Sequence, residues 1–219
     1  MRIADCGLRI ADYDAWAATY PAVAHNPVMR AEQAVVEPLL FRLRPKRALD
    51  VGTGSGRYLD MLASAGANAV GVDFSMGMLA KSRTRRICGD ARALPIRSAA
   101  VDLVNASLMV GDIDALGAWA REMARVLAPG GHLVYSDFHS NWTRFGWRRT
   151  FRDAAGALRE LPFEPHATDD HRHALSAAGL TIELAHEARL VDDRDRAVRD
   201  FRQRWGDVAV VLVLHATKR

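Results

Sequence analysis

The amino-acid sequence predicts an α/β fold in which a mostly parallel sheet of seven strands is covered by helices on both faces and includes an antiparallel strand near its C-terminal end. From residue 46 onward, short apolar runs of strand length alternate with amphipathic stretches of helical period. Repeated β-α units of this kind build a mostly parallel sheet. Two strand-like runs then follow each other with only a charged connector between them, which predicts an antiparallel strand.

The first 45 residues predict an N-terminal helical cap. The motif Arg-Ile-Ala-Asp occurs twice within residues 1–12, and we interpret it as a frayed extension without function. Tyr13, Trp16 and Tyr20 have the spacing of one helix face, and prolines then interrupt the pattern. A second helix is predicted over residues 28–43.

Strands and helices alternate over residues 46–139, which form the predicted core. The predicted strands cover residues 48–52, 69–73, 86–88, 101–107 and 132–138. The predicted helices cover residues 57–65, 76–83 and 115–127, and Pro129-Gly130-Gly131 ends the last of them.

The segment 140–166 breaks this alternation because it is rich in aromatic residues, arginine and proline, and we expect an inserted lid or an extra pair of helices. Residues 167–219 continue the same domain. They predict a helix over 168–178, a strand over 181–190, a solvated connector or helix over 192–204 and a last strand over 208–217.

Composition excludes wholesale disorder, since 49% of the 219 residues are hydrophobic and suffice for one large core. The longest apolar run, Val208–Leu214, is far shorter than the roughly 20 residues of a membrane-spanning helix. The N-terminus carries Arg2, Asp5 and Arg9 and lacks the apolar core of a signal peptide. We therefore expect a cytoplasmic protein without membrane insertion.

All but three of the 30 cationic residues are arginine, and the net charge is +4. Arginine binds planar anions through paired hydrogen bonds, which suits nucleic acid or acidic substrates, whereas a GC-rich coding sequence produces the same excess. A charge of +4 is modest for a nucleic-acid-binding protein and argues against that partner. Cys6 and Cys88 have no metal-ligand spacing, so we expect free thiols.

The strongest local signal is Leu49-Asp50-Val51-Gly52-Thr53-Gly54-Ser55-Gly56-Arg57. Its glycines allow a sharp strand-to-helix turn and close approach of a ligand to the helix N-terminus. Asp73 ends the next strand, where a carboxylate can hold ribose hydroxyls, and Gly89-Asp90-Ala91 follows the third strand, where one can accept from an adenine amine. The carboxyl ends of these strands therefore predict a nucleoside site.

A dinucleotide fingerprint needs glycine at position 57, where Arg57 stands. The G-x-G-x-G loop instead resembles that of the class I S-adenosylmethionine (SAM)-dependent methyltransferases, in particular the small-molecule branch with the quinone-biosynthesis and malonyl-carrier-protein methyltransferases. The segments that carry the resemblance are Leu49–Arg57, Val70–Ser75, Gly89–Ala91, Leu94-Pro95, Val101–Val104, Arg125–Gly131 and the N-terminal Tyr13–Tyr20. It implies a Rossmann-like fold, SAM as cofactor and S-adenosylhomocysteine (SAH) as product.

The resemblance also implies site residues. Those around the methionine end of the cofactor would be Asp50, Gly52, Gly54 and Gly56. Asp73 would hold the ribose, and Phe74 or Met76 would lie against the adenine. Asp90 would accept from the adenine amine, with Ala91 supplying a backbone N–H. Ser107, Leu108 and Met109, after the fourth strand, would line the cleft near the sulfonium, and Tyr20 would close it.

A general base is needed only when the acceptor must lose a proton, because SAM already carries its methyl group on a positively charged sulfur. The candidate base is His139, at the end of the fifth strand. Asp137 shares its strand face by the two-residue alternation and could orient the imidazole. The alternative is that His139 only hydrogen-bonds the lid or caps a helix.

The insert interleaves aromatic residues with arginines, which suits an apolar acceptor that carries a carboxylate or phosphate. The candidate substrate contacts are Trp142, Arg144, Trp147 and Arg148. Two alternatives fit the same pattern: these side chains could stack on RNA bases, or they could form the solvated basic face of an amphipathic helix. His166, His171 and His173 lie near Thr168-Asp169-Asp170, but this acidic stretch is explained as a helix start, and we expect no metal.

These observations predict a SAM-dependent methyltransferase that acts by in-line displacement on a small-molecule acceptor, free or linked to a carrier protein. Malonyl-carrier-protein and quinone-type acceptors are the leading candidates. The alternatives are an RNA or protein methyltransferase and a non-catalytic SAM-binding partner subunit. We expect a monomer or homodimer.

Overall fold

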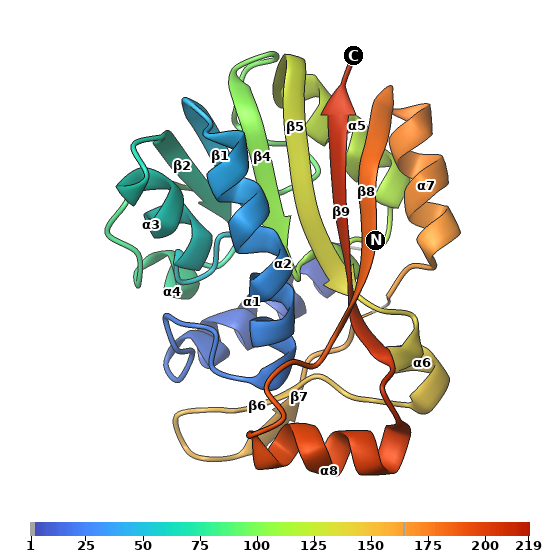
Figure 1. Cartoon of the computed structure of the whole chain (residues 1–219). Helices are drawn as coiled ribbons and strands as arrows, with labels where there is room; N and C mark the ends of the chain where they lie inside the picture. The colour runs from blue at the N-terminus through green and yellow to red at the C-terminus, as the bar shows by residue number, and fades with distance from the viewer. Residues whose placement is uncertain (1–2, 164) are drawn as a thin grey trace.

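The computed structural model describes residues 3–163 and 165–219, built around a central sheet with strand order β3-β2-β1-β4-β5-β9-β8 (Figure 1). The strands are β1 (Arg47–Val51), β2 (Asn68–Asp73), β3 (Arg86–Cys88), β4 (Val101–Ser107), β5 (Leu127–Phe138), β8 (Leu180–Arg189) and β9 (Ala209–Lys218). Strands β1 to β5 pair in parallel, and β9 runs antiparallel to both β5 and β8. The predicted seven-stranded α/β sheet with an antiparallel strand is confirmed.

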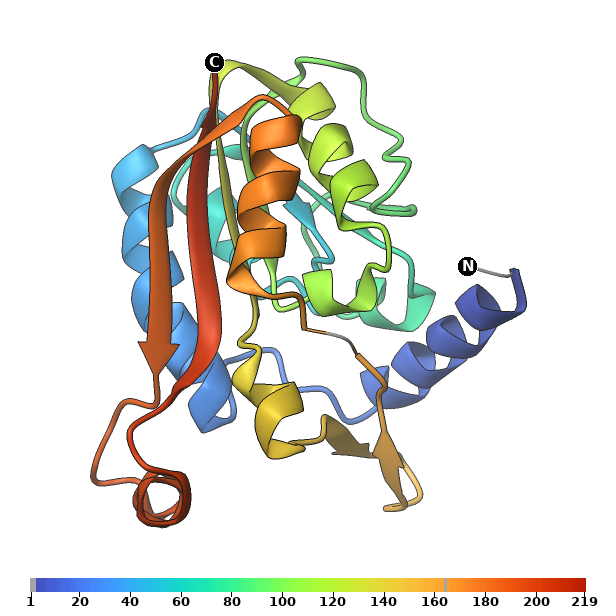
Figure 2. The same ribbon diagram turned by 90° about the vertical axis from the view of Figure 1, so that its right-hand side faces the viewer.

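Helices cover both faces of the sheet (Figure 2). They are α1 (Ile3–Ala17), α2 (Pro27–Leu43), α3 (Arg57–Ser64), α4 (Met76–Leu79), η1 (Val110–Asp112), α5 (Leu116–Val126), α6 (Asn141–Phe145), α7 (Thr168–Ala177) and α8 (Arg196–Trp205). Along the described residues, none of them combines the length and apolarity needed to cross a bilayer.

Alternation along the strands divides the core between these two faces. Ala48 and Leu103 pack in the cluster that α2 and α3 cover, whereas their neighbours Leu49 and Val104 pack in the cluster that α5 and α7 cover. Successive side chains of a strand point to opposite faces, so each buried strand supplies both clusters. This explains why the strands read as continuous apolar runs.

Two helix boundaries differ from the prediction. α1 begins at Ile3, so the expected frayed extension is wrong over the described part of that segment, and residues 1–2 lie outside it. α4 ends at Leu79 instead of continuing to residue 83, because Lys81 N–H and Ser82 N–H donate to carbonyls only three residues back, and this tighter turn does not continue the helix.

β5 starts earlier than the predicted 132–138, since Leu127 already pairs with Val101 before a register shift brings His132 opposite Leu103. The expected helix pair in the insert is also wrong: α6 is followed by a two-stranded hairpin of β6 (Thr150–Arg152) and β7 (Leu158–Glu160). The hairpin, α1, α6 and α8 lie beyond the carboxyl ends of the parallel strands (Figure 1).

Candidate functional site

A cavity of about 1050 Å³ lies at the carboxyl ends of β1, β2 and β4. Eight of the ten predicted cofactor residues line it, namely Tyr20, Gly52, Gly54, Asp73, Phe74, Asp90, Ala91 and Ser107. Asp50 and Gly56 do not belong to its lining. The strand ends thus bring together residues that are distant in the sequence, as expected for an open α/β sheet.

Asp50 is buried beneath the glycine loop and not on the cavity. It accepts hydrogen bonds from Thr53 Oγ1 at 2.6 Å and from Asn105 Nδ2 at 2.7 Å. Burial raises the pKa of Asp50 from 3.8 to about 6. Gly56 is the N-cap residue just before α3 and has φ +92°, and a Cβ there would meet Ser82 at 2.7 Å, so this glycine serves close packing.

The upper part of the loop faces the cavity. Gly54 has φ +55°, and a Cβ built on it meets no protein atom within 4 Å, so this side of the loop is left open for a ligand. Gly54 N–H donates to Asp73 Oδ2 at 2.8 Å, and Ser75 N–H donates to Oδ1 at 2.9 Å. Burial raises the pKa of Asp73. Its carboxylate therefore joins the loop after β1 to the end of β2.

Asp90 and Phe74 lie further along the same wall. Arg92 binds the Asp90 carboxylate through Nε at 2.9 Å and Nη2 at 2.6 Å, and this hydrogen bonding lowers the pKa of Asp90. The Phe74 ring meets the Tyr13 ring edge-on, with 5.2 Å between the centroids. Phe74 is thus part of the contact between the strand edge and α1.

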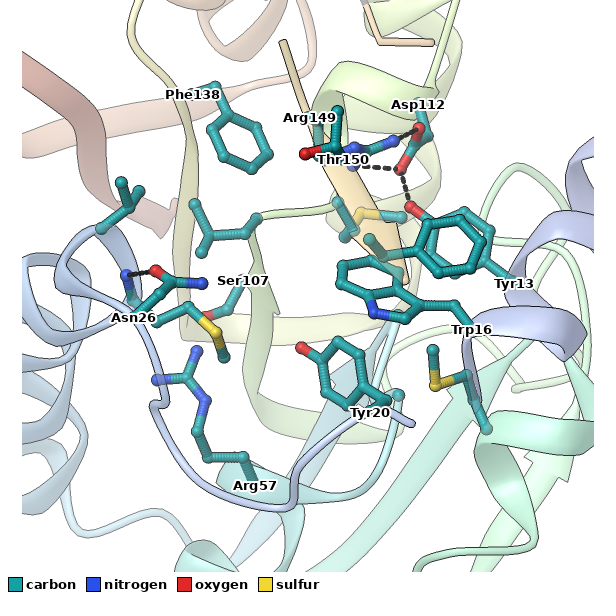
Figure 3. Close-up of a pocket in the computed structure, with 18 of the residues that line it drawn as sticks. Tyr13, Trp16, Tyr20, Asn26, Arg57, Ser107, Asp112, Phe138, Arg149 and Thr150 are labelled. Atoms are coloured by element: carbon teal, nitrogen blue, oxygen red, sulfur yellow. Dashed lines mark hydrogen bonds and ion pairs between the residues drawn. The ribbon is translucent and has the colours of Figure 1, made fainter. Parts of the chain in front are cut away.

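α1, the segment after it and the hairpin roof the cavity. Trp16 stacks on Phe151 with 5.3 Å between the ring centroids and meets Tyr20 edge-on at 4.7 Å. Thr19 Oγ1 donates to the backbone oxygen of Arg152 at 2.7 Å. Figure 3 shows Tyr13, Trp16 and Tyr20 along one side of the space that they enclose.

A buried ion pair fixes this roof to the sheet. Arg149 Nη2 and Nη1 donate to Asp112 Oδ1 and Oδ2 at 2.6 and 3.2 Å, and Tyr13 Oη donates to Oδ2 at 2.5 Å (Figure 3). The Arg149 guanidinium also lies within 6 Å of the Tyr13, Phe138 and Phe163 rings, where a cation is attracted to the aromatic faces. η1, α1 and the start of the hairpin just before β6 are therefore held together at one point.

Aromatic side chains line the opposite part of the cavity; they are Phe138, Trp142, Trp147, Phe201 and Trp205. Trp142 Nε1 donates to the backbone oxygen of Val210 at 2.9 Å, which fixes its ring. Trp147 packs on Phe201 and Trp205, with 5.0 and 5.6 Å between centroids. The expected contacts Trp142 and Trp147 thus line the cavity.

The two predicted arginines differ. Arg148 lines the cavity and pairs with Glu160 at 3.1 Å, with 72% of its side chain exposed. Arg144 is absent from the lining and lies over the Phe145 ring.

The predicted pairing of Asp137 with His139 is wrong. Asp137 Oδ2 lies 3.4 Å from His171 Nε2, and Oδ1 accepts from Gly111 N–H. His139 does not line the cavity: its Nδ1 accepts from Asn141 N–H, and its Nε2 faces Glu187 at 3.5 Å. β5 ends at Phe138, so the alternation that places two residues on one face stops before His139.

Sequence reasoning missed several lining residues, namely His25, Asn26, Arg57, Asp112 and those of α8. Arg57 follows the glycine loop directly and could have been singled out by that position. Arg149 belongs to the arginines that the insert interleaves with aromatic residues, but its partner Asp112 meets it only in the folded chain, and no local pattern marks that pair.

No group of three or more His, Cys, Asp or Glu side chains suited to a metal occurs in the described residues. His171 is buried, with Nδ1 3.1 Å from Tyr135 Oη, and His166 Nε2 faces the Ile113 oxygen at 2.9 Å. Cys88 is a free thiol on the cavity wall, and the Cys6 side chain lies outside the described part.

Comparison with known proteins agrees with this geometry. A family model described as a methyltransferase domain matches residues 49–135. Over 183 residues the chain is 39% identical to a demethylmenaquinone methyltransferase of Mycolicibacterium vanbaalenii, covering 79% of this chain and 76% of that protein. It is 33% identical over 132 residues to a malonyl-[acyl-carrier protein] O-methyltransferase of Methylococcus capsulatus. That match covers 53% of this chain and 48% of the other protein.

The matched segments span 25% to 48% of the length of several curated relatives. Among solved structures, an S-adenosylmethionine dependent methyltransferase from Mesorhizobium loti is similar with a TM-score of 0.67 and 22% identity. That similarity covers 86% of this chain and 100% of the other, and it shows the fold. The chain therefore belongs to the class I SAM-dependent methyltransferases.

Proposed function

We propose that this protein transfers the methyl group of SAM to a small-molecule acceptor, either free or linked to a carrier protein. One observation carries the proposal: a single cavity extends from the glycine loop, Asp73 and Asp90 to the aromatic region around Trp142 and Trp147. Its volume of about 1050 Å³ lies slightly above the roughly 300–1,000 Å³ of ligand pockets, as expected for a site that takes two molecules.

The residues at the sheet end of the cavity fit SAM. Gly54 leaves open space where a side chain would stand, so the backbone can approach the methionine part closely. Arg57 lies beside it and offers a cation to the carboxylate of that part. Asp73 presents a buried carboxylate to the ribose hydroxyls, and Asp90 and Ala91 lie where the adenine amine and ring would be read.

When bound, SAM supplies a methyl group on a positively charged sulfur. The chain's part is to hold the acceptor in line with that bond and to exclude water. Trp16, Tyr20 and Phe151 roof the cavity, and the ion pair of Arg149 with Asp112 keeps this roof closed. Ser107 lies at the end of β4, between the cofactor and acceptor parts.

The acceptor part of the cavity is apolar, with a polar edge. Trp142, Trp147 and Trp205 offer flat apolar surface, and Arg148 lies at the exposed rim, where a carboxylate or phosphate would remain in water. This arrangement suits both acceptor classes in the names of the relatives, a quinol-type ring and a malonyl group on a carrier protein. His139 does not enter the proposal, because it does not line the cavity.

The cofactor assignment is tested by titrating SAH into the protein in a calorimeter. Asp73→Asn should weaken binding at least about tenfold, because hydrogen bonds to a charged acceptor are lost. Asp200→Asn is the matched control, since Asp200 lies on α8 with 66% of its side chain exposed. Equal affinity in the two variants would remove Asp73 from the site, and thermal unfolding reports whether the loop itself has been lost.

The reaction is tested by transfer of tritiated methyl from SAM to quinol-type acceptors, to malonyl-carrier protein and to RNA. Product on a small molecule or a carrier-linked group is the expected result. Product on RNA alone would contradict the proposed acceptor class. SAH binding without product in any arm would indicate a SAM-binding subunit that does not transfer methyl.

A further inference from the structure

Glu32 is a fully buried acidic residue that belongs neither to the cavity lining nor to any sequence motif. It projects from α2 and is 0% exposed. Its Oε2 accepts from Arg57 Nη2 at 2.9 Å and from Tyr58 Oη at 2.7 Å. Its Oε1 accepts from Ser136 Oγ on β5 at 3.0 Å. One carboxylate therefore connects the start of α3 with the centre of the sheet.

The Ser136 branch continues to the backbone of Leu108. Leu108 N–H donates to Ser136 Oγ at 3.0 Å and to the Ser136 backbone oxygen at 3.1 Å. Leu108 follows the end of β4 directly, lines the cavity and has φ +54°, in the left-handed region that leucine rarely adopts. A backbone held there needs partners that fix it, and the hydroxyl of Ser136 is one of them.

The other branch fixes Arg57. Its guanidinium donates to Glu32 and also, through Nη1, to Gln33 Oε1 at 3.1 Å and Tyr58 Oη at 3.2 Å. These bonds orient a side chain that lines the cavity beside the glycine loop (Figure 3). Because the ion pair is buried, moving either partner leaves a charge poorly solvated, so the arrangement is stiff.

We propose that Glu32 is a positioning residue for methyl transfer: its two oxygens set, at the same time, the backbone of Leu108 beside Ser107 and the direction of Arg57. The inference rests on the proposed function, since it assigns the methyl-transfer point to the segment after β4. Small displacements of groups that hold reactants in line are costly in rate, so a residue that touches neither SAM nor acceptor controls turnover through this link.

Two variants cut the link in different ways. Ser136→Ala removes the hydroxyl that joins Glu32 to Leu108 but leaves the Arg57 branch intact. Glu32→Gln keeps the size of the side chain and removes the charge that both branches share. Glu183→Gln is the matched control, because Glu183 is an exposed residue of β8 outside the cavity lining.

The first measurement needs no acceptor: amide hydrogen exchange of Leu108 in the SAH complex, followed by NMR. Exchange should be at least about threefold faster in both Ser136→Ala and Glu32→Gln. In Ser136→Ala the Leu108 amide loses the hydroxyl, which is one of its two acceptors. In Glu32→Gln the same hydroxyl loses its charged partner and is held less firmly. Exchange should be unchanged in Glu183→Gln. Unchanged exchange in both Ser136→Ala and Glu32→Gln would overturn the proposal.

The second measurement uses the acceptor found by methyl transfer. In Ser136→Ala, kcat should fall about tenfold while KM for SAM stays within about twofold, because positioning and not cofactor binding is lost. A rise of about tenfold in KM for SAM, with kcat unchanged, would overturn the proposal. If the wild type binds SAH but forms no product, the proposed function fails and the role of Glu32 in methyl transfer fails with it, whereas the exchange measurement still tests separately whether Glu32 and Ser136 hold the Leu108 backbone.

Discussion

Arg149 allows the sharpest test of how the roof of the cavity is held. Its side chain is 8% exposed, and its guanidinium donates to both oxygens of Asp112, which also accepts from Tyr13. Arg149→Met keeps an unbranched side chain of similar bulk among the surrounding rings but takes away the cation that neutralises Asp112. Breaking a buried ion pair by removing one partner costs about 3–5 kcal/mol of unfolding free energy.

Urea and thermal unfolding of the protein without ligands measure this cost. For a chain of this length each 1 kcal/mol corresponds to about 2–4 °C, so the expected fall in Tm is roughly 6–20 °C. Arg148→Met is the matched control, since Arg148 is 72% exposed and pairs with a Glu160 side chain that is 44% exposed. Surface pairs of this kind contribute about 0–1 kcal/mol.

Equal losses of stability in Arg149→Met and Arg148→Met would refute the reasoning. A second check is the double variant Arg149→Met with Asp112→Asn. It should recover part of the stability lost in Arg149→Met, because the buried charge is then gone as well. Further loss in the double variant would show that the two residues act independently.

Three further predictions concern the loop and the cofactor wall. Burial raises the pKa of Asp50 from 3.8 to about 6. Between these two pH values Asp50 is protonated in the folded state and ionised in the unfolded state, so the free energy of unfolding falls by roughly 3 kcal/mol as the pH rises through this range. Asp50→Asn should flatten this dependence in urea unfolding from pH 4 to 7; an unchanged slope would contradict it. Gly54→Ala and Gly146→Ala should lose similar stability, because both positions have positive φ and open space, but only Gly54→Ala should weaken SAH binding in calorimetry. Bound SAH should slow the alkylation of Cys88, measured by mass spectrometry, because this free thiol lines the cavity. Equal rates with and without SAH would place the cofactor elsewhere.

The parts of the fold that follow from local patterns were predictable. Neighbours such as Leu103 and Val104 are both apolar because a central strand is buried on both faces. The resulting apolar runs allowed the strands to be predicted. Asp73 and Asp90 could be placed in one site because the carboxyl ends of parallel strands meet at one edge of the sheet. The site at the sheet end was therefore predictable.

The contacts that hold the roof of the cavity were not predictable, because they join segments that are far apart in the chain. Tyr13, Asp112 and Arg149 come from three such segments, and Arg149 reads in the sequence like its exposed neighbour Arg148. His139 was misplaced for a different reason: the strand ended one residue before it, and a periodic pattern carries no information beyond the end of its element.

The position of β9 between β5 and β8 has a consequence for how the chain reaches this fold. β5 lies near the middle of the sheet, yet the strand that covers its second edge follows every other strand in the sequence. During synthesis β5 therefore has an unpaired edge of buried, apolar residues, and such edges invite association with other chains. The chain is thus open to association through this edge from the completion of β5 until β9 has been made and has paired with it.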